Sequence, residues 1–299
     1  MSDVSFENRV AVITGAGGGL GKTYALELAK RGAKVVVNDL GGGADGTGSS
    51  PMADAVVEEI KAAGGEAVAN YDSVATPEGG EAIIKTALDS FGRIDVVVNN
   101  AGILRDKSFT KLPPEDLAIV LDVHLKGAFF VSQPAFRAMK EQKYGRFVFT
   151  ASAAGIFGNF GQANYGAAKM GLVGLSNVLA LEGKKSNIKS NVIAPISRTR
   201  LTEQLLGPMA AALDPEQVTP LVAYLASEAC DLTHETFSVG GGRFARIFVG
   251  LCQGHAFGKG SKPSAEDIKE NIEKIMDTEG YVIPASIQDE MGLIMKALM

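Results

Sequence analysis

Residues 9–21 read RVAVITGAGGGLG, and this stretch decides the fold. Arg9–Thr14 is a short apolar run typical of a buried strand, and the helical pattern of Leu20–Lys30 follows the glycines. Glycine is needed where a chain turns tightly from a strand into a helix, and where backbone must come close to a pyrophosphate. The N-terminus of the helix adds free N–H donors and a partial positive charge. The stretch therefore predicts a phosphate-binding turn made by Gly15, Gly17, Gly19, Leu20 and Gly21, although a glycine-rich turn alone is as often only structural.

The same alternation of strand and helix continues along the chain. Further strand patterns lie at residues 34–38, 66–70, 94–99, 146–150 and 190–193, and helical patterns lie between them, notably at 52–63, 115–140 and 163–184. The main body closes near residues 235–239. Strands that are apolar throughout are typical of a parallel sheet covered on both faces. We therefore predict an α/β fold: a single Rossmann-like, doubly wound parallel sheet with helices on both faces and a C-terminal helical extension.

We expect two parts of unequal size. Residues 1–242 form the main domain, including a lid over the substrate at about 196–213, where Leu201, Leu205, Leu206 and Met209 have near-helical spacing. Such a stripe fits core packing as well as a substrate wall. Residues 243–299 form an extension with helical patterns at 264–276 and 287–298, packed on the same domain. The segment GGGADGTGSS, residues 41–50, reads as a flexible loop inserted after the second strand.

The composition argues against several classes of protein. The net charge of −5 in 299 residues gives no reason to expect nucleic acid or a membrane surface as a partner. The two cysteines make neither a disulfide framework nor a metal cluster, so we expect no metal and a reducing compartment. The polar start of the chain is unlike a signal peptide, and the final ALM is unlike an SKL-type signal. We expect a cytoplasmic location.

An acidic residue stands where a dinucleotide site needs one. Asp39 ends the second strand, about 20 residues after the glycines. A carboxylate there accepts a hydrogen bond from a ribose 2′-hydroxyl and repels a 2′-phosphate. We therefore predict NAD as the cofactor rather than NADP. The alternative is an ordinary turn residue at the surface.

Tyr165 and Lys169 are candidates for proton transfer. They are four residues apart on a predicted helix, so they share one face. An ammonium about 4 Å away, at an effective dielectric constant of about 20, would lower the pKa of a tyrosine by about 3 units from its usual value near 10. Tyr165 would then act as a general acid/base near neutral pH. Ser152 follows the strand at 146–150 and would hold the substrate oxygen beside Tyr165. The alternatives are a packed tyrosine, a surface lysine and an ordinary strand-end serine.

These motifs carry a family resemblance. TGAGGGLG at 14–21, NNAG at 99–102, Ser152 and YGAAK at 165–169 resemble the short-chain dehydrogenase/reductase family over about residues 6–242. The resemblance implies hydride transfer between a nicotinamide and a carbinol carbon, with Ser152, Tyr165 and Lys169 as catalytic residues and with Ser152 and Tyr165 contacting the substrate. A fourth family residue, usually asparagine, aligns with His124. An imidazole can still bind a water in a proton relay, or it can simply pack in its helix.

The resemblance also implies which residues contact the cofactor. It places the adenine near Asp72 and Ser73 and the ribose on Asp39. The other implied contacts are Asn99, Ala101, Gly102, Tyr165, Lys169, Pro195, Ile196 and Thr199. Four basic residues could meet coenzyme A phosphates or could be plain surface charge: Arg105, Lys107, Arg198 and Arg200.

Longer segments look like one subfamily. NDLGG at 38–42, ANYDSV at 69–74 and GIFGNFGQANYGAAK at 155–169 are similar to (3R)-3-hydroxyacyl-CoA dehydrogenases, in which the histidine variant also occurs. This implies NAD-dependent oxidation of (3R)-3-hydroxyacyl-CoA to 3-oxoacyl-CoA, a homodimer, and a separate enoyl-CoA hydratase in the same pathway. A hydroxysteroid or steroid-side-chain-CoA dehydrogenase is an alternative. A non-catalytic NAD(H)-binding sensor is an alternative of another class.

Overall fold

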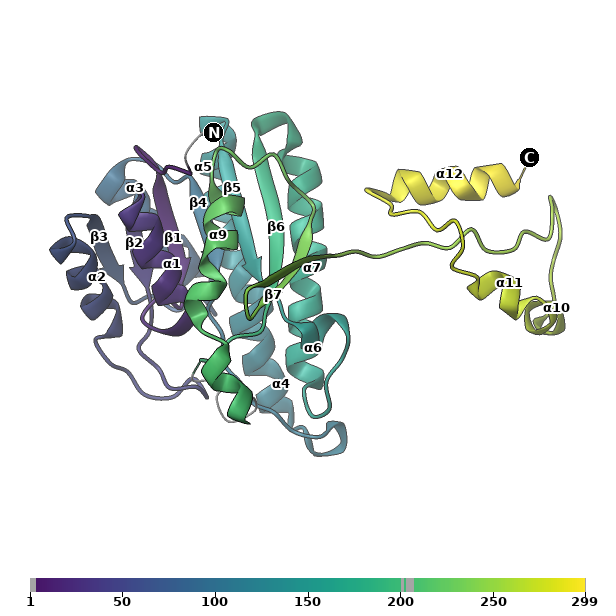
Figure 1. Ribbon diagram of the computed structural model, residues 1–299, viewed down its shortest axis with the longest axis horizontal. Helices are drawn as coiled ribbons and strands as arrows, with labels where there is room; N and C mark the ends of the chain where they lie inside the picture. Colours follow the sequence, from purple (N-terminus) through teal and green to yellow (C-terminus); the bar gives the residue numbers. More distant parts are fainter. Residues whose placement is uncertain (1–3, 200–201, 203–206, 299) are drawn as a thin grey trace. The chain divides into compact units, whose positions relative to one another are not determined.

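A computed structural model describes residues 4–199, 202 and 207–298. Its main feature is one sheet in the strand order β3-β2-β1-β4-β5-β6-β7-β8, with parallel pairing from β3 through β7. The strands are β1 (Val10–Thr14), β2 (Lys34–Asn38), β3 (Glu66–Asn70), β4 (Val96–Asn99), β5 (Gly145–Thr150), β6 (Ile188–Pro195), β7 (Thr236–Gly240) and β8 (Arg243–Ile247). The predicted Rossmann-like, doubly wound sheet is confirmed (Figure 1).

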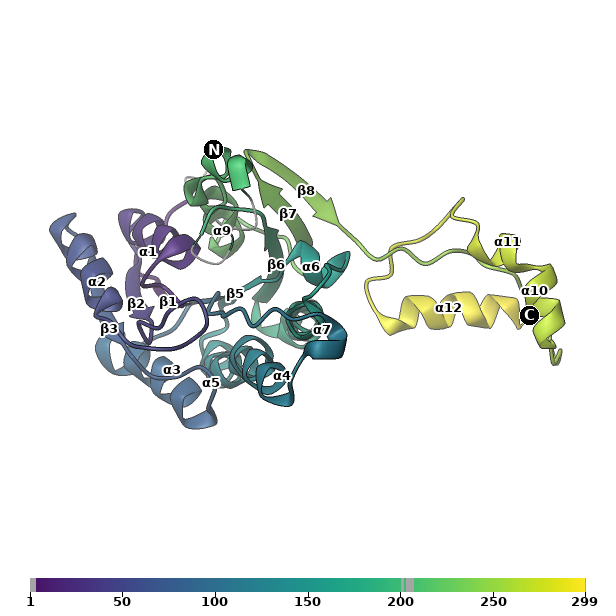
Figure 2. The same cartoon turned by 90° about the horizontal axis from the view of Figure 1, so that it is seen from below.

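Helices cover both faces of the sheet (Figure 2). These are α1 (Gly19–Lys30), α2 (Met52–Ala62), α3 (Pro77–Phe91), α5 (Gly127–Gln142), α7 (Ala163–Gly183) and α9 (Thr219–Ala226). Two further helices, α4 (Pro114–Leu121) and α6 (Ala153–Ile156), pack on α7. Strand β1 shows why two layers form: Ala11 and Ile13 join the core beneath α1, α2 and α9, whereas Val10 and Val12 join the core beneath α3, α5 and α7. A strand that is apolar at every position therefore fills both cores.

The sheet reverses its direction of growth at β1. The chain first adds β2 and β3 on one side of β1 and then crosses to add β4 on the other side. Connections leaving the carboxyl ends of β1 and β4 diverge at this point, which opens a crevice. The glycine-rich turn between β1 and α1 lies at that crevice.

The last strand was not expected. Residues from Arg243 onward were assigned to the extension, but β8 continues the sheet beside β7. The two residues between these strands, Gly241 and Gly242, have φ angles of 57° and 75°. Two successive residues with positive φ make the tight turn that suits a two-residue hairpin. The glycine pair, which we had not interpreted, was the signal for this hairpin.

The single long helix expected at 115–140 is interrupted. A π-helical turn, Asp122–Lys126, joins α4 to α5. A π-helical turn holds one residue more than an α-helical turn, and such turns often occur at functional sites. This turn carries His124.

The chain divides into two compact units, Met1–Arg246 and Ile247–Met299. The second unit contains α10 (Ala265–Glu270), α11 (Ile272–Met276) and α12 (Ile287–Ala297), close to the expected helical segments. No described side chain of this unit is fully buried. That the extension packs on the main domain stays a prediction.

The expected lid is described only in part. Leu201, Leu205 and Leu206 lie outside the described residues. The described remainder includes a 3₁₀ helix, Gly207–Ala212, in which Met209 is 65% exposed. The role of this segment as a lid stays a prediction. Among the described helices, none combines the length and the apolar character needed to cross a bilayer.

Candidate functional site

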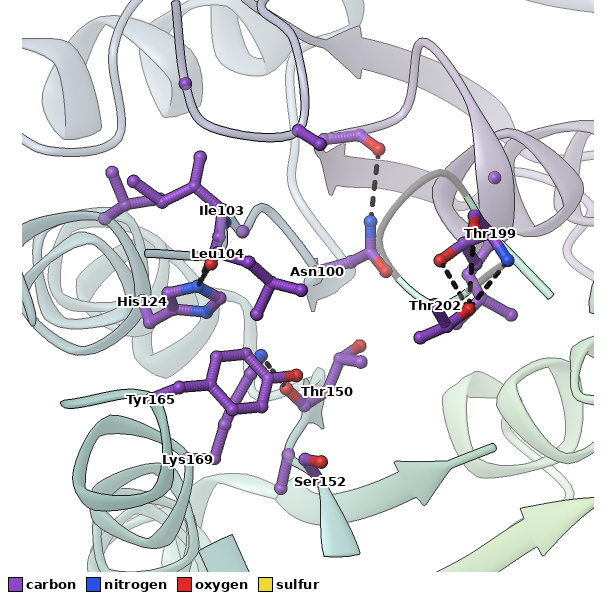
Figure 3. Close-up of a pocket in the computed structure, with 18 of the residues that line it drawn as sticks. Asn100, Ile103, Leu104, His124, Thr150, Ser152, Tyr165, Lys169, Thr199 and Thr202 are labelled. Atoms are coloured by element: carbon purple, nitrogen blue, oxygen red, sulfur yellow. Dashed lines mark hydrogen bonds between the residues drawn. The ribbon is translucent and has the colours of Figure 1, made fainter. Parts of the chain in front are cut away.

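A cavity of about 600 Å³ lies at the carboxyl ends of the central strands. Its walls come from the turn after β1, the ends of β2, β4, β5 and β6, the π-helical turn and α7. Figure 3 shows Tyr165, Lys169 and Ser152 on one side of it and Thr199 and Thr202 on another. The predicted site residues that line the cavity are Gly15, Gly19, Leu20, Asp39, Asp72, Ser73, Gly102, His124, Ser152, Tyr165, Lys169, Pro195, Ile196 and Thr199.

The turn after β1 fits a phosphate group because side chains are excluded from it. Gly15 has a φ of +64°, in the left-handed region that favours glycine. A Cβ atom on Gly21 would lie 2.3 Å from the carbonyl oxygen of Gly15. A Cβ on Gly17 would lie 2.9 Å from the Asp39 carboxylate. Gly17 and Gly21 do not line the cavity. Their lack of a side chain lets the turn pack against Asp39 and against the backbone of Gly15.

Asp39 links the glycine-rich turn after β1 to the segment that follows β2. Its Oδ2 accepts a hydrogen bond of 2.8 Å from the backbone N–H of Gly17, and its Oδ1 accepts one of 2.7 Å from Gly41. The carboxylate also lines the cavity. Asp39 therefore shapes the glycine turn while it presents negative charge to a ligand.

The NNAG motif is used differently from our expectation. The side chain of Asn99 is buried, and its amide donates to the Ser132 hydroxyl at 3.0 Å, away from the cavity. Ala101 does not line the cavity either, whereas Asn100 does. The Asn100 amide donates to the carbonyl oxygens of Thr14 and Gly15 at 3.0 and 3.1 Å. Asn100 lies in the NNAG motif that we expect to line the cofactor cleft, and it does line the cavity.

Tyr165 and Lys169 lie together on α7, as the spacing predicts, with the lysine Nζ 5.5 Å from the centre of the tyrosine ring. The Lys169 Nζ donates to the Thr150 carbonyl oxygen at 2.5 Å. Ser152 is the N-cap of α6, where its hydroxyl oxygen accepts from the N–H of Ala154 at 3.2 Å. The segment that follows β5 and the first two turns of α7 thus place Ser152, Tyr165 and Lys169 on one wall of the cavity.

The protonation of this pair differs from our expectation. Burial raises the pKa of Tyr165 to about 12, against the opposing effect of a hydrogen bond with Ser152. Burial also lowers the pKa of Lys169 to about 7. The expectation of a tyrosine with a depressed pKa is therefore wrong for this state of the protein. It treated the lysine as a permanent ammonium, whereas removal from water disfavours both charged forms.

His124 is buried beside Tyr165. Its Nε2 lies 2.8 Å from the carbonyl oxygen of Ile103 and 3.0 Å from the N–H of the same residue. Its ring meets the Tyr165 ring edge-on, with 5.2 Å between centres. Burial, assisted by Lys169, lowers the pKa of His124 to about 3, so the imidazole is neutral at physiological pH. A Cβ on Gly102 would lie 2.4 Å from the imidazole Cε1, so a glycine is needed at that position.

The two imidazole nitrogens of His124 differ in their contacts. If Nε2–H donates to the Ile103 carbonyl, then Nδ1 is the acceptor. Nδ1 is buried and has no hydrogen-bond partner among the described residues. The chemistry of this nitrogen suits a bound water.

The four basic residues considered for coenzyme A phosphates are not equivalent. Arg105 already binds the backbone of residue 45 and the carboxylate of Asp116. Lys107 and Arg198 are exposed, and Arg200 lies outside the described residues. The structure therefore gives Arg105 a role within the protein.

Comparisons with known proteins agree with this geometry. The model of the family described as short chain dehydrogenase matches residues 9–206. Peroxisomal multifunctional enzyme type 2 of Mus musculus is 51% identical over 99% of this chain and 40% of its own length. A putative short-chain type dehydrogenase/reductase of Mycobacterium tuberculosis is 54% identical over 93% of this chain and 97% of its own length. The structure of full-length peroxisomal multifunctional enzyme type 2 from Drosophila melanogaster has a TM-score of 0.83 and 39% identity, covering 98% of this chain and 50% of that one.

The comparisons differ in how much of each relative they include. This chain spans half or less of the mouse and fly multifunctional enzymes, but nearly the whole length of the mycobacterial protein. The resemblance drawn from the motifs is confirmed.

Proposed function

The chain belongs to the short-chain dehydrogenase family of enzymes, and we propose that it oxidises (3R)-3-hydroxyacyl-CoA to 3-oxoacyl-CoA with NAD. The observation that carries the proposal is that one cavity joins the glycine turn and Asp39 to Ser152, Tyr165 and Lys169. Identity of 51% to the mouse multifunctional enzyme over almost the whole chain supports the hydroxyacyl substrate.

The residues of the catalytic wall divide the proton chemistry among them. A nicotinamide dinucleotide held by the glycine turn and Asp39 would supply the acceptor for the hydride of the carbinol carbon. The Ser152 hydroxyl holds the substrate oxygen, and the Tyr165 oxygen takes the hydroxyl proton as general base. Lys169, held by the Thr150 carbonyl, can pass a proton onward because its pKa is about 7. The acceptor Nδ1 of His124 would hold a water at the end of this relay.

The choice of NAD over NADP rests on Asp39. The family implies a nicotinamide dinucleotide of either kind. The Asp39 carboxylate lines the cavity and is held in place by two backbone N–H groups. A 2′-phosphate beside this carboxylate would be repelled, whereas a 2′-hydroxyl would donate to it.

A homodimer is part of the same proposal. Large apolar side chains are 39–50% exposed on α4, α5 and α7, namely Leu117, Phe129, Met170, Val178 and Leu181. Gly174 has no neighbouring atom within 4 Å of the place of a Cβ, so a second helix can approach closely. A separate enoyl-CoA hydratase would then supply the substrate.

The test is a comparison of substrates in one assay of NAD reduction. A 3-hydroxyacyl-CoA, the corresponding free 3-hydroxy acid and a free hydroxysteroid are offered at equal concentration. The proposal expects turnover of the thioester and at least tenfold less with the other two. Turnover of the steroid alone would replace the proposal with the hydroxysteroid alternative. Binding of NAD without turnover of any alcohol would favour the sensor.

A further inference from the structure

The glycine-rich insert at residues 41–50 is not a free loop. The Ala44 carbonyl oxygen accepts a hydrogen bond of 3.0 Å from the backbone N–H of Leu104, which follows β4. A Cβ on Gly46 would lie 3.1 Å from the Ile103 side chain, so the insert packs against that residue. Inside the insert, the Asp45 carboxylate accepts from the N–H and the hydroxyl of Thr47 at 3.0 and 2.8 Å. We call residues 41–50 the strap.

The strap crosses the dinucleotide end of the cavity. It leaves β2 beside Asp39, and its tip reaches the segment after β4, on the other side of β1. Its lining residues are Gly42, Gly43, Ala44 and Gly46. Since these have small side chains or none, the strap closes this end with backbone and does not fill the cavity.

Arg105 fastens the tip of the strap. Its Nε donates to the Asp45 carbonyl oxygen at 2.9 Å, and its Nη1 donates to the Asp116 carboxylate at 3.1 Å. The backbone of Arg105 is fixed as well, because its carbonyl oxygen accepts from the amide of Asn164 at 3.0 Å. Asn164 is fully buried and precedes Tyr165. The guanidinium therefore extends from a rigid point and acts as a latch.

We propose that Arg105 is a positioning residue for the coenzyme: it latches the strap across the dinucleotide end of the cavity, and the coenzyme leaves only when the strap opens. The proposal depends on the cavity holding a nicotinamide dinucleotide, which is part of the proposed function. It gives the glycine-rich insert a role in retaining the coenzyme rather than in the chemical step.

The two ends of the strap make a sharp test possible. The Ser50 hydroxyl donates to the Gly41 carbonyl oxygen at 3.0 Å, and a Cβ on Gly41 would lie 2.3 Å from the Ser50 backbone nitrogen. Because the ends already touch, residues 42–49 can be deleted and Gly41 joined to Ser50 with little strain elsewhere. Arg105→Ala releases the latch without shortening the chain. Arg137→Ala is the matched control, since it removes an exposed ion pair with Glu81 outside the cavity.

The measurement is the dissociation rate of NADH, followed by stopped-flow fluorescence after displacement with excess NAD. Loss of a charge-assisted hydrogen bond predicts release about tenfold faster in Arg105→Ala. The deletion predicts release faster again, and Arg137→Ala predicts the wild-type rate. Thermal unfolding of each variant checks that the fold is kept.

Hydrogen exchange of the wild-type holoenzyme gives a second readout. Bound NADH should slow exchange of the Leu104 amide and the strap amides at least tenfold, which is expected only if the coenzyme lies beneath a closed strap. An unchanged NADH release rate in Arg105→Ala, or strap amides indifferent to bound NADH, would overturn the proposal even if the deletion variant fails to fold. If the wild-type protein binds neither NADH nor NADPH, the cofactor assignment itself fails, and the strap proposal fails with it.

Discussion

The dinucleotide end of the cavity and its catalytic end are built from different parts of the chain. At the dinucleotide end the walls are mostly backbone: the glycine turn after β1, the strap, and a carboxylate whose two oxygens accept backbone N–H groups. At the catalytic end the walls are mostly side chains, of which His124 and Lys169 are buried and Ser152 and Tyr165 are half-buried. A substitution at the dinucleotide end should therefore change the shape of the cavity and its affinity for the coenzyme, whereas one at the catalytic end should change proton transfer.

The contrast extends to electrostatics. Burial raises the pKa of Tyr165 to about 12 and lowers that of His124 to about 3, so both are neutral at physiological pH, while the lowered pKa of Lys169, about 7, lets it exchange a proton there. Asp39 lines the open cavity and accepts from two N–H donors. The carboxylate thus lies at the coenzyme end, and the groups that exchange protons lie at the catalytic end.

The largest effect should come from Tyr165→Phe. Removing a general acid/base lowers kcat by about 10²–10⁴-fold, while NADH affinity should stay within about twofold because the dinucleotide end is untouched. Steady-state kinetics and fluorescence titration measure the two quantities. Tyr224→Phe, a partly exposed tyrosine on α9, is the control. Equal losses of kcat and NADH affinity would mean that the two ends do not act separately.

The pH dependence of oxidation should be steep. With the pKa of Tyr165 at about 12, the free enzyme holds little phenolate at neutral pH, and the fraction grows about tenfold per pH unit. The kcat/KM for oxidation should therefore rise between pH 7 and 10 without levelling, whereas that for the reverse reduction, which needs the protonated tyrosine, should not rise. A plateau for oxidation near pH 7 to 8 would restore the depressed pKa that the sequence suggested.

Asp39→Asn should change coenzyme choice by a smaller factor. The amide keeps one acceptor for a backbone N–H but loses the negative charge that opposes a 2′-phosphate. We expect the ratio of NADP to NAD affinity to rise about tenfold, with kcat for the bound coenzyme unchanged. Titration with NADH and NADPH measures the ratio. An unaltered ratio would remove Asp39 as the selector.

The smallest effect should come from His124→Asn. Asparagine offers both a donor and an acceptor, so it can satisfy the Ile103 backbone groups that His124 now contacts. We expect kcat within about tenfold of wild type and the same pH profile between pH 5 and 8 in both proteins, since His124, with a pKa of about 3, does not titrate in that range. His124→Ala, by contrast, leaves buried polar groups without partners, which costs about 1–3 kcal/mol of unfolding free energy. If asparagine is no better than alanine, the relay role of His124 is wrong.

Most of the sheet could be predicted because its inner strands carry short apolar runs such as VAVIT and VVV. Residues 34–38 and 66–70 were predicted with their observed bounds. Short runs such as KVVVN, bounded by glycines, are typical of buried strands. Strand β8 could not be recognised from RFARI, where apolar and basic residues alternate at an exposed edge. The interruption of the long helix at Asp122–Lys126 also escaped, because a π-helical turn leaves no fixed residue pattern.

The sequence predicts which residues line the site, but it does not predict their pKa values. Spacing on a helix brings Tyr165 and Lys169 together, but it does not show that Lys169 is buried or that burial shifts the pKa of both groups. Similarly, NNAG marks the end of β4, but only the fold shows that Asn99 turns towards α5 while Asn100 faces the glycine turn. The strap was read as flexible because glycines indicate freedom, whereas here they permit close packing on Ile103.

In the proposed function, the cavity holds a hydroxyacyl thioester so that hydride leaves from one face of its carbinol carbon only. The most direct measurement is the initial rate of NAD reduction with the pure (3R) and (3S) enantiomers of one medium-chain 3-hydroxyacyl-CoA. We predict turnover of the (3R) thioester and at least a hundredfold slower reaction of the (3S) form. Equal rates, or preference for the (3S) thioester, would contradict the account.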